Sequence, residues 1–344
     1  MDFRSDNVTG VAPEIMAAVV AASEGSVSSY GADEITERLT KRFADLFEHD
    51  VAVFPVATGT AANALSLAAI TPPWGVIYCH RLAHIEIDEC GAPEFYCGGA
   101  RLAPLDGADG KLQAEDLMGA VASGGQGVVH HMQPAAISIT QASEAGTIYR
   151  PAEIAAIAEI ARSHHLGLHM DGSRFANAVA SLGCHPADIT WRAGVDVLSF
   201  GATKNGALGV EAVVFFDPAK AVDFAFRRKR GGHLFSKMRF LSAQLEAYLE
   251  NDLWLRNATQ ANTMAARLAR GLGQVPDIRL IHPVEANELF VELPESVLQG
   301  LEKEGYRFYR RDGAKPSIRL VTAFNTRESD IEGFVASARR HGKT

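Results

Sequence analysis

Short apolar segments alternate with helical segments through the first two thirds of the chain. Residues 36–48 carry apolar side chains at helical spacing, and an apolar strand follows at residues 51–57. Further strands are expected at residues 75–79, 101–105 and 128–140 and in "LGLHM" and "VDVLSF", and further helices at residues 83–96, 113–122 and 151–165. This alternation predicts an α/β fold, with a mainly parallel sheet covered by helices on both faces. Ligands of such sheets bind beyond the carboxyl ends of the strands.

The pattern changes after "EAVVFFDP". A basic stretch, "FRRKRGGHLFSKMRF", leads into long helices that reach about residue 272, and shorter strands and helices follow. We therefore predict a large domain over residues 1–255 and a small C-terminal α/β domain over residues 256–344. No internal repeat or low-complexity linker separates them.

Composition narrows the possible functions. The chain has 344 residues, of which 47% are hydrophobic and 22% charged, and a net charge of −8. Such a balance argues against a nucleic-acid or anionic-membrane partner, and no apolar run approaches the length of a membrane span. The opening "MDFRSDNVTG" lacks the features of a secretory signal, and the four cysteines lack metal-binding spacing. We expect a cytoplasmic enzyme with reduced thiols and no bound metal.

Two segments carry the candidate chemistry. "LHMDGSR" ends a predicted strand with Asp171 and Arg174, and "DVLSFGATKNG" leads from another strand into Lys204. A pyridoxal phosphate enzyme needs a lysine for a Schiff base and an aspartate that keeps the pyridine nitrogen protonated. Thr58, Gly59 and Thr60 stand between a strand and a helix, where free N–H groups bind phosphate. Taken singly, the aspartate and threonine also fit ordinary helix caps, and the lysine a solvated loop.

Seven motifs together resemble one family over nearly the whole chain. They are "RSDNVTG", "YGADEITERL", "TGTAANALSL", "AHIEIDECGAPEF", "HMDGSRFANA", "SFGATKNG" and "IRLVT". In this order they are similar to the low-specificity L-threonine aldolases, which use pyridoxal 5'-phosphate and have the aspartate-aminotransferase fold (fold type I). The resemblance implies a seven-stranded, mostly parallel sheet in the large domain. It also implies retro-aldol cleavage of L-threonine, L-allo-threonine and related β-hydroxy-α-amino acids to glycine and an aldehyde.

The resemblance also assigns the cofactor site. Lys204 matches the Schiff-base lysine, and Asp171 matches the carboxylate that pairs with the pyridine nitrogen. His84 matches the imidazole that stacks on the ring, and Gly59 and Thr60 match the phosphate site. Lys204, His84 and Asp171 are thus the expected catalytic residues. His84 is chemically suited to accept the β-hydroxyl proton, directly or through a water.

The substrate and subunit contacts follow from the same matches. Ser5, Arg174 and Arg319 match groups that hold the substrate carboxylate, and Arg174 is also expected at the cofactor. Arg239 matches a basic residue that reaches the phosphate from a neighbouring subunit, where Arg230 could assist it. The six Lys/Arg residues between Arg227 and Arg239 also favour a subunit interface, although a basic helix end that complements its own dipole is the alternative. We therefore expect at least a dimer, and a homotetramer, a dimer of dimers, with shared active sites.

The chain departs from the commonest family pattern at two places. It has "DGSR" instead of "DGAR", and "TQASEAG" at residues 140–146 instead of "ENTHNG", so that Glu144 aligns with a substrate-facing histidine. Aldolases that favour aryl substrates look similar here, which makes a phenylserine preference an alternative. Glu86, Asp88 and Glu89 are expected on a mostly solvated helix face, with Glu89 the candidate to face the site. His169 is expected to be structural and to point into the sheet.

Three alternatives to a threonine aldolase differ in how well the sequence supports them. A β-eliminating lyase or an aminotransferase on the same fold is the second enzymatic hypothesis, but an aminotransferase needs a site for a second carboxylate, and none is evident. A non-catalytic homologue would be expected to lack Lys204 or Asp171, and both are present. A dinucleotide-binding dehydrogenase is excluded in practice, because no G-x-G-x-x-G follows a strand.

Overall fold

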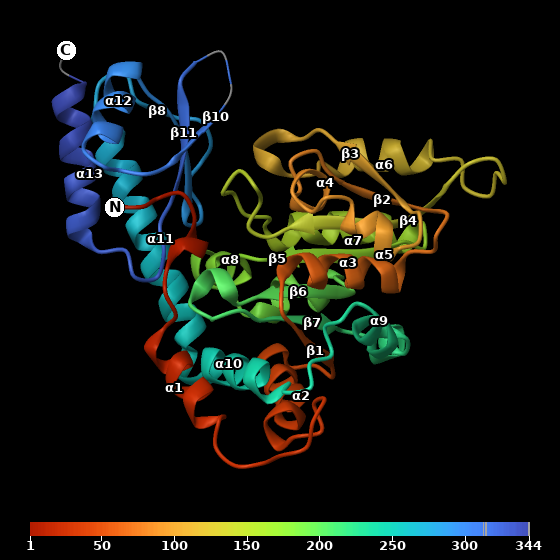
Figure 1. The fold of residues 1–344 in the computed structure, drawn as a ribbon. Helices are drawn as coiled ribbons and strands as arrows, with labels where there is room; N and C mark the ends of the chain where they lie inside the picture. The colour runs from red at the N-terminus through yellow and green to blue at the C-terminus, as the bar shows by residue number, and fades with distance from the viewer. Residues whose placement is uncertain (312, 314, 343–344) are drawn as a thin grey trace.

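A computed structural model describes residues 1–311, 313 and 315–342 of the chain (Figure 1). The helices are α1 (Pro13–Ala21), α2 (Glu34–Phe47), α3 (Gly59–Ile70), α4 (His84–Ile87), α5 (Ala92–Tyr96), α6 (Ala114–Ala122), α7 (Pro151–Ser163), α8 (Phe175–Leu182), α9 (Phe224–Arg230), α10 (Arg239–Leu249), α11 (Leu253–Leu272), α12 (Glu295–Lys303) and α13 (Glu328–His341). The strands are β1 (Ala52–Val56), β2 (Gly75–His80), β3 (Arg101–Leu105), β4 (Gln133–Thr140), β5 (Gly167–Gly172), β6 (Val197–Gly201), β7 (Glu211–Phe215), β8 (Arg279–Leu280), β9 (Glu288–Glu292), β10 (Tyr309–Arg311) and β11 (Ser317–Val321).

The large sheet has seven strands in the order β1-β7-β6-β5-β4-β2-β3. Strand β7 runs antiparallel to both of its neighbours, and the remaining pairs are parallel. Alternate side chains of β7 pack on opposite faces: Val213 and Phe215 belong to a core with α3 and α9, and Ala212 and Val214 to a core with α2, α8 and α10. This confirms the predicted α/β fold with a mostly parallel seven-stranded sheet.

A second sheet of four strands, β10-β11-β9-β8, is antiparallel throughout. It packs with α11, α12 and α13 around a separate hydrophobic core that also contains Phe3 from the start of the chain. Helix α11 runs from the large sheet into this second unit and crosses the predicted boundary at residue 255 (Figure 1). The division into domains 1–255 and 256–344 therefore stays a prediction.

Two sequence expectations were wrong in extent. The helix expected over residues 83–96 is two short helices, α4 and α5, because Cys90 and Gly91 between them have positive φ angles of 51° and 73°. The strand expected from residue 128 begins only at Gln133. The side chain of Gln133 bonds the preceding turn instead, accepting from the Gly127 N–H at 2.7 Å and donating to the Val128 carbonyl at 3.0 Å.

Among the described residues, no helix combines the length and the apolar character needed to cross a membrane. The four cysteines are free thiols.

Candidate active site

A cavity of about 240 Å³ lies at the carboxyl edge of the large sheet. Strands β1 and β6 both run antiparallel to β7, so their carboxyl ends share this edge with the end of β5. The cavity is lined by Asn7, Ala57, Thr58, Gly59, Thr60, Asn63, His84, Glu89, Asp171, Ser173, Thr203, Lys204 and Glu211. It thus brings together five of the seven residues expected at the cofactor through β1, β5, β6 and the start of α4, whereas Arg174 and Arg239 do not line it.

Asp171 is a fixed hydrogen-bond acceptor in the cavity wall. Its residue is 3% exposed, and its Oδ1 accepts from the Ser173 N–H at 3.0 Å. Its Oδ2 accepts from the Asn63 side-chain amide at 2.9 Å. The two donors fix the position of the carboxylate and leave its oxygens as acceptors.

Lys204 lies in a short 3-10 helix, Thr203–Asn205, directly after β6. Asn205 anchors this turn, since its side-chain amide donates to the Tyr248 hydroxyl at 2.7 Å and to the Trp254 carbonyl at 2.8 Å. Within the described residues no hydrogen bond or ion pair involves the Lys204 amine, which is therefore available to a ligand in the cavity.

The start of α3 gives the cavity an anion-binding end. The hydroxyl of Thr58 accepts from the Ala61 N–H at 3.2 Å and so caps the helix. This cap leaves the first-turn N–H groups of Gly59 and Thr60 without an intrahelical acceptor, at the positive end of the helix dipole.

Sequence reasoning gave no role to five polar residues of this cavity, Asn7, Asn63, Ser173, Thr203 and Glu211, and two of them, Asn63 and Glu211, are buried. Asn63 lies inside the Ala/Leu-rich helix α3 and is 2% exposed. Glu211 opens the apolar strand β7, and its Oε2 accepts from the Ala202 N–H at 2.6 Å. Burial raises the pKa of Glu211 to about 7. A single polar residue beginning or interrupting an apolar run was the available signal in both cases.

The three acidic residues after His84 differ in their exposure to solvent. Glu86 and Asp88 are exposed, as expected for a solvated face, whereas Glu89 is 4% exposed and lines the cavity. The candidate for a site-facing carboxylate is thus the one that lies at the cavity.

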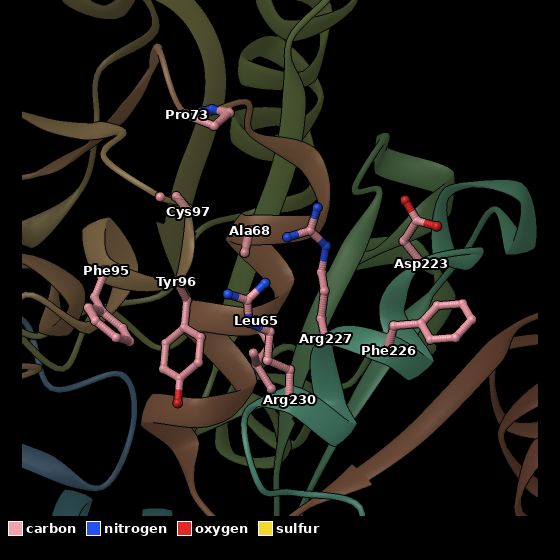
Figure 2. Close-up of a pocket in the computed structure, with 11 residues that line it drawn as sticks. Leu65, Ala68, Pro73, Phe95, Tyr96, Cys97, Asp223, Phe226, Arg227 and Arg230 are labelled. Carbon is pink, nitrogen blue, oxygen red and sulfur yellow. The ribbon is translucent and has the colours of Figure 1, made fainter.

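Arg239 and Arg230 lie away from the cavity of their own chain. Arg239 donates to the Glu24 and Gly25 carbonyls, each at 3.3 Å, at the start of α10. Arg230 lines a different groove of about 730 Å³, together with Arg227 and exposed Phe226, as Figure 2 shows. A contact of either arginine with a phosphate therefore needs a second chain, and that contact stays a prediction.

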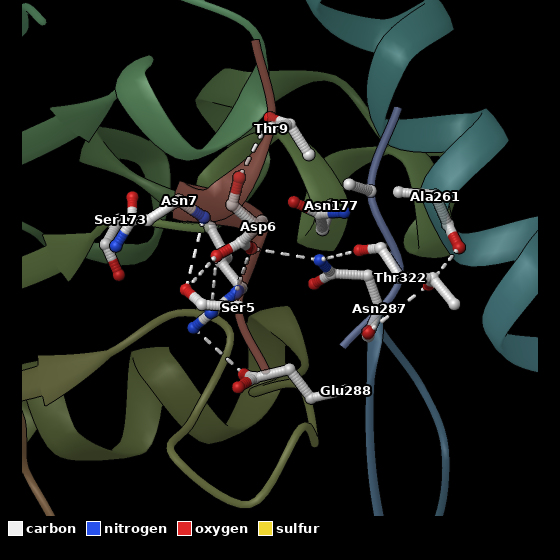
Figure 3. Close-up of polar contacts among 12 residues, drawn as sticks. Ser5, Asp6, Asn7, Thr9, Ser173, Asn177, Ala261, Asn287, Glu288 and Thr322 are labelled. Atoms are coloured by element: carbon white, nitrogen blue, oxygen red, sulfur yellow. Dashed lines mark hydrogen bonds and ion pairs between the residues drawn. The ribbon is translucent and has the colours of Figure 1, made fainter. Parts of the chain in front are cut away.

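Arg174 does not line the cavity. Its side chain is 2% exposed, its Nε donates to Asp6 Oδ2 at 2.8 Å, and its Nη1 lies 3.0 Å from Glu288 Oε2. Figure 3 shows Asp6 and Glu288 in this buried network, with Asn287 bonded to Asp6. Burial acts to raise the pKa of Asp6, but the charges of Arg174 and Lys204 hold it below its ordinary value. Arg174 is thus paired with two buried carboxylates, and its expected contact with substrate and cofactor stays a prediction.

The other two expected substrate contacts also lie outside the cavity wall. Ser5 accepts from the Asn7 N–H at 3.1 Å and so caps a short helix beside Asp6. Arg319 on β11 is half-buried and pairs with Glu288, its Nε lying 3.0 Å from Oε1. Glu288 therefore connects Arg319 with Arg174 at the junction of the two sheets.

Glu144 occupies the loop after β4, where the family pattern has histidine. Burial and then the charge of Glu288 raise the pKa of its carboxyl, while the charges of Lys204 and Arg174 act in the opposite direction. The residue thus faces the same group of charges as Arg174.

Comparisons with known proteins agree with this geometry. Residues 2–296 match the family described as beta-eliminating lyase. A low specificity L-threonine aldolase of a Pseudomonas species is 42% identical over 337 residues, which cover 98% of this chain and 96% of that protein. The Pseudomonas aeruginosa protein of the same name is 45% identical over 330 residues, covering 96% and 94%. A solved threonine aldolase of Leishmania major superimposes with a TM-score of 0.93 at 27% identity, covering 99% of each chain.

The fold and the site together are those of a lyase. The chain belongs to the beta-eliminating lyase family, and within it to the group of the low-specificity L-threonine aldolases.

Proposed function

We propose that this chain cleaves the Cα–Cβ bond of L-threonine, L-allo-threonine and related β-hydroxy-α-amino acids, giving glycine and an aldehyde, with pyridoxal 5'-phosphate as cofactor. The observation that carries the proposal is the cavity in which Lys204, Asp171 and His84 meet the start of α3. The identity of 42–45% to low specificity L-threonine aldolases supports it.

The residues present fit this cofactor. Asp171 is a fixed acceptor for a protonated ring nitrogen, and the start of α3 offers donors to a phosphate. The unpaired amine of Lys204 is the group to which an aldehyde can attach. When bound, pyridoxal phosphate supplies an electron sink for the electron pair that remains on Cα when the Cα–Cβ bond breaks.

The chain's own residues would bind and orient the substrate and would move protons to and from it. Arg319 would hold the substrate carboxylate and so turn the Cα–Cβ bond toward the reactive orientation. His84 would take the β-hydroxyl proton while the O–H electron pair forms the carbonyl of the aldehyde. The Lys204 amine would return a proton to Cα, which completes glycine.

Product analysis tests the function. The holoenzyme is incubated with L-threonine, L-allo-threonine and L-phenylserine, with D-threonine and a K204A variant as controls. We expect glycine and the matching aldehyde in equal amounts from the L-substrates only, and faster benzaldehyde release would favour the phenylserine alternative. Release of ammonia and a 2-oxo acid without glycine would replace the proposal by a β-elimination.

We further propose a homotetramer, a dimer of dimers, in the cytoplasm. Arg239 lies outside its own cavity, and the groove in Figure 2 exposes Phe95 and Phe226 beside Arg230. Both observations support a second chain at this face, since exposed aromatic and arginine side chains are typical of protein interfaces.

A further inference from the structure

Glu89 is a buried carboxyl in the wall of the cavity. It lies in the turn between α4 and α5, and its side chain has 0% exposure, whereas the side chain of His84 beside it is 32% exposed. Taking a carboxylate out of water is costly unless donors compensate for the lost hydration. The partners of Glu89 therefore indicate what its burial achieves.

Both polar neighbours of Glu89 bind the same oxygen. Nδ1 of His84 lies 2.8 Å from Oε1, and the Asn63 side-chain amide donates to Oε1 at 2.8 Å. The second hydrogen of that amide goes to Asp171 Oδ2 at 2.9 Å. His84, Glu89, Asn63 and Asp171 thus form one continuous chain of hydrogen bonds along the cavity wall.

The donors fix the tautomer of His84. Asn63 can only donate through its amide nitrogen, so Oε1 of Glu89 is an acceptor. Nδ1 of His84 then carries its proton toward Glu89, and Nε2 is the basic nitrogen left for the cavity. Oε2 of Glu89 has no hydrogen-bond partner among the described residues.

The directions in which the pKa values of His84 and Glu89 are shifted agree with this arrangement. The hydrogen bond to Glu89 raises the pKa of His84, although burial of the ring acts in the opposite direction. Burial raises the pKa of Glu89, against the hydrogen bonds from His84 and Asn63. The other charged groups that act on His84 are Asp171 on β5, which raises its pKa, and Lys204 after β6, which lowers it.

We propose that Glu89 is a positioning residue for His84: it holds Nδ1–H, directs Nε2 into the cavity and stabilises the imidazolium that forms when His84 accepts a proton. This inference rests on the proposed function for the identity of that proton, which is the one on the β-hydroxyl. Glu89 would thus act as a carboxylate that orients a catalytic histidine without touching the substrate.

Three holoenzyme variants test the proposal. E89Q keeps the shape of the side chain but removes its charge, E89D keeps the charge on a shorter side chain, and E86Q is the matched control on the exposed face of α4. The first readout is kcat/KM for L-threonine against pH, with cofactor occupancy checked by absorbance. The second is the pH dependence of diethyl pyrocarbonate modification at His84, which reports neutral imidazole and is resolved from the other histidines by peptide mass spectrometry.

In E89Q we expect the acid limb of the rate profile and the modification profile of His84 both to move to lower pH. The plateau should fall roughly tenfold to hundredfold, because a general base contributes about 10²–10⁴-fold and Gln weakens it. E89D should lie between E89Q and the wild type, and E86Q should match the wild type.

A lower plateau without movement of either profile would overturn the proposal, since a structural role alone produces that result. If E89Q does not fold, the rate profile and the modification profile of E89D decide whether Glu89 positions His84. If the wild type releases no glycine, the proposed function fails, and the modification profile of His84 still decides whether Glu89 controls that ring.

Discussion

Lys204 is the residue whose chemistry can be tested most directly. Its amine has no hydrogen-bond or ion-pair partner among the described residues and lines the cavity with Asp171. Borohydride reduction of the holoenzyme should therefore leave a pyridoxyl group on the peptide that contains Lys204, as mass spectrometry would show. Label on Lys229 or Lys237 instead would contradict the assignment, and K204A should carry none.

Asp171 is expected to act on rate more than on folding. In D171N only one of the two contacts from Asn63 and Ser173 can persist, because an amide has a single acceptor oxygen. The neutral amide also no longer keeps a bound pyridine ring protonated. We expect roughly a hundredfold or greater loss of kcat, comparable to the loss of one strong electrostatic contact in other active sites. The measurement is turnover of L-threonine at equal cofactor occupancy, and near-normal turnover would exclude the role.

Arg174 and Arg319 should give opposite results although both pair with Glu288. R174A leaves buried Asp6 and Glu288 without their shared cation and should destabilise the fold by about 3–5 kcal/mol. R319A should instead raise KM for the amino acid, by about 2–5 kcal/mol in binding, with cofactor affinity unchanged. Denaturant unfolding and steady-state kinetics separate the two effects. A normal KM in R319A would remove Arg319 from the substrate site.

His169 connects three strands of the large sheet. It is fully buried on β5, its Nδ1 lies 2.8 Å from the Ser138 hydroxyl on β4, and its Nε2 lies 3.0 Å from the Ser199 hydroxyl on β6. Burial lowers its pKa from 6.5 to about 4. The unfolded chain therefore takes up this proton first as the pH falls, so stability is intact above pH 6.5 and declines toward pH 4.

The pH dependence of unfolding tests this contribution. By pH 4 the wild type should lose about 3 kcal/mol of unfolding free energy through this group alone, and H169Q should lack that part of the decline. The gap between wild type and H169Q should thus narrow as the pH falls, whereas exposed H130Q should keep the wild-type slope. Parallel curves for H169Q and wild type would show that His169 does not titrate in this way.

Elements whose apolar pattern is long and regular could be predicted from the sequence. The strand that carries Asp171, the strand that precedes Lys204 and the helix that begins at Gly59 lie where the pattern places them, because two-sided burial requires continuous apolar runs. The break at Cys90 and Gly91 could not be predicted, since it depends on local backbone angles. Glu89, which lies next to this break, was nevertheless the acidic residue expected to face the site.

Charge pairing between distant segments was beyond the reach of the sequence. Asp6, Arg174 and Glu288 come from the start, middle and end of the chain, and only the packing of the second sheet against the first brings them together. The motif that contains Arg174 therefore gave no sign of the two carboxylates with which Arg174 pairs.

The proposed assembly makes each active site depend on two chains. Arg239 is half-exposed at the start of α10 and does not line its own cavity. If it completes the phosphate site of a partner, R239A should weaken pyridoxal phosphate binding about tenfold to a hundredfold, the range for a hydrogen bond to a charged group. Arg162, exposed on α7, provides the matched control as R162A. Light scattering of the wild type gives the number of chains.

Mixing two weakened proteins is the sharper test of shared sites. K204A lacks the reactive amine but keeps Arg239, and R239A keeps the amine but lacks the partner's arginine. A hybrid of the two would contain one complete site, formed by Lys204 of one chain and Arg239 of the other. After unfolding and joint refolding, the mixture should therefore release glycine faster at limiting cofactor than either variant refolded alone. No gain in the mixture, or a stable monomer that binds the cofactor tightly, would show that each chain completes its own site.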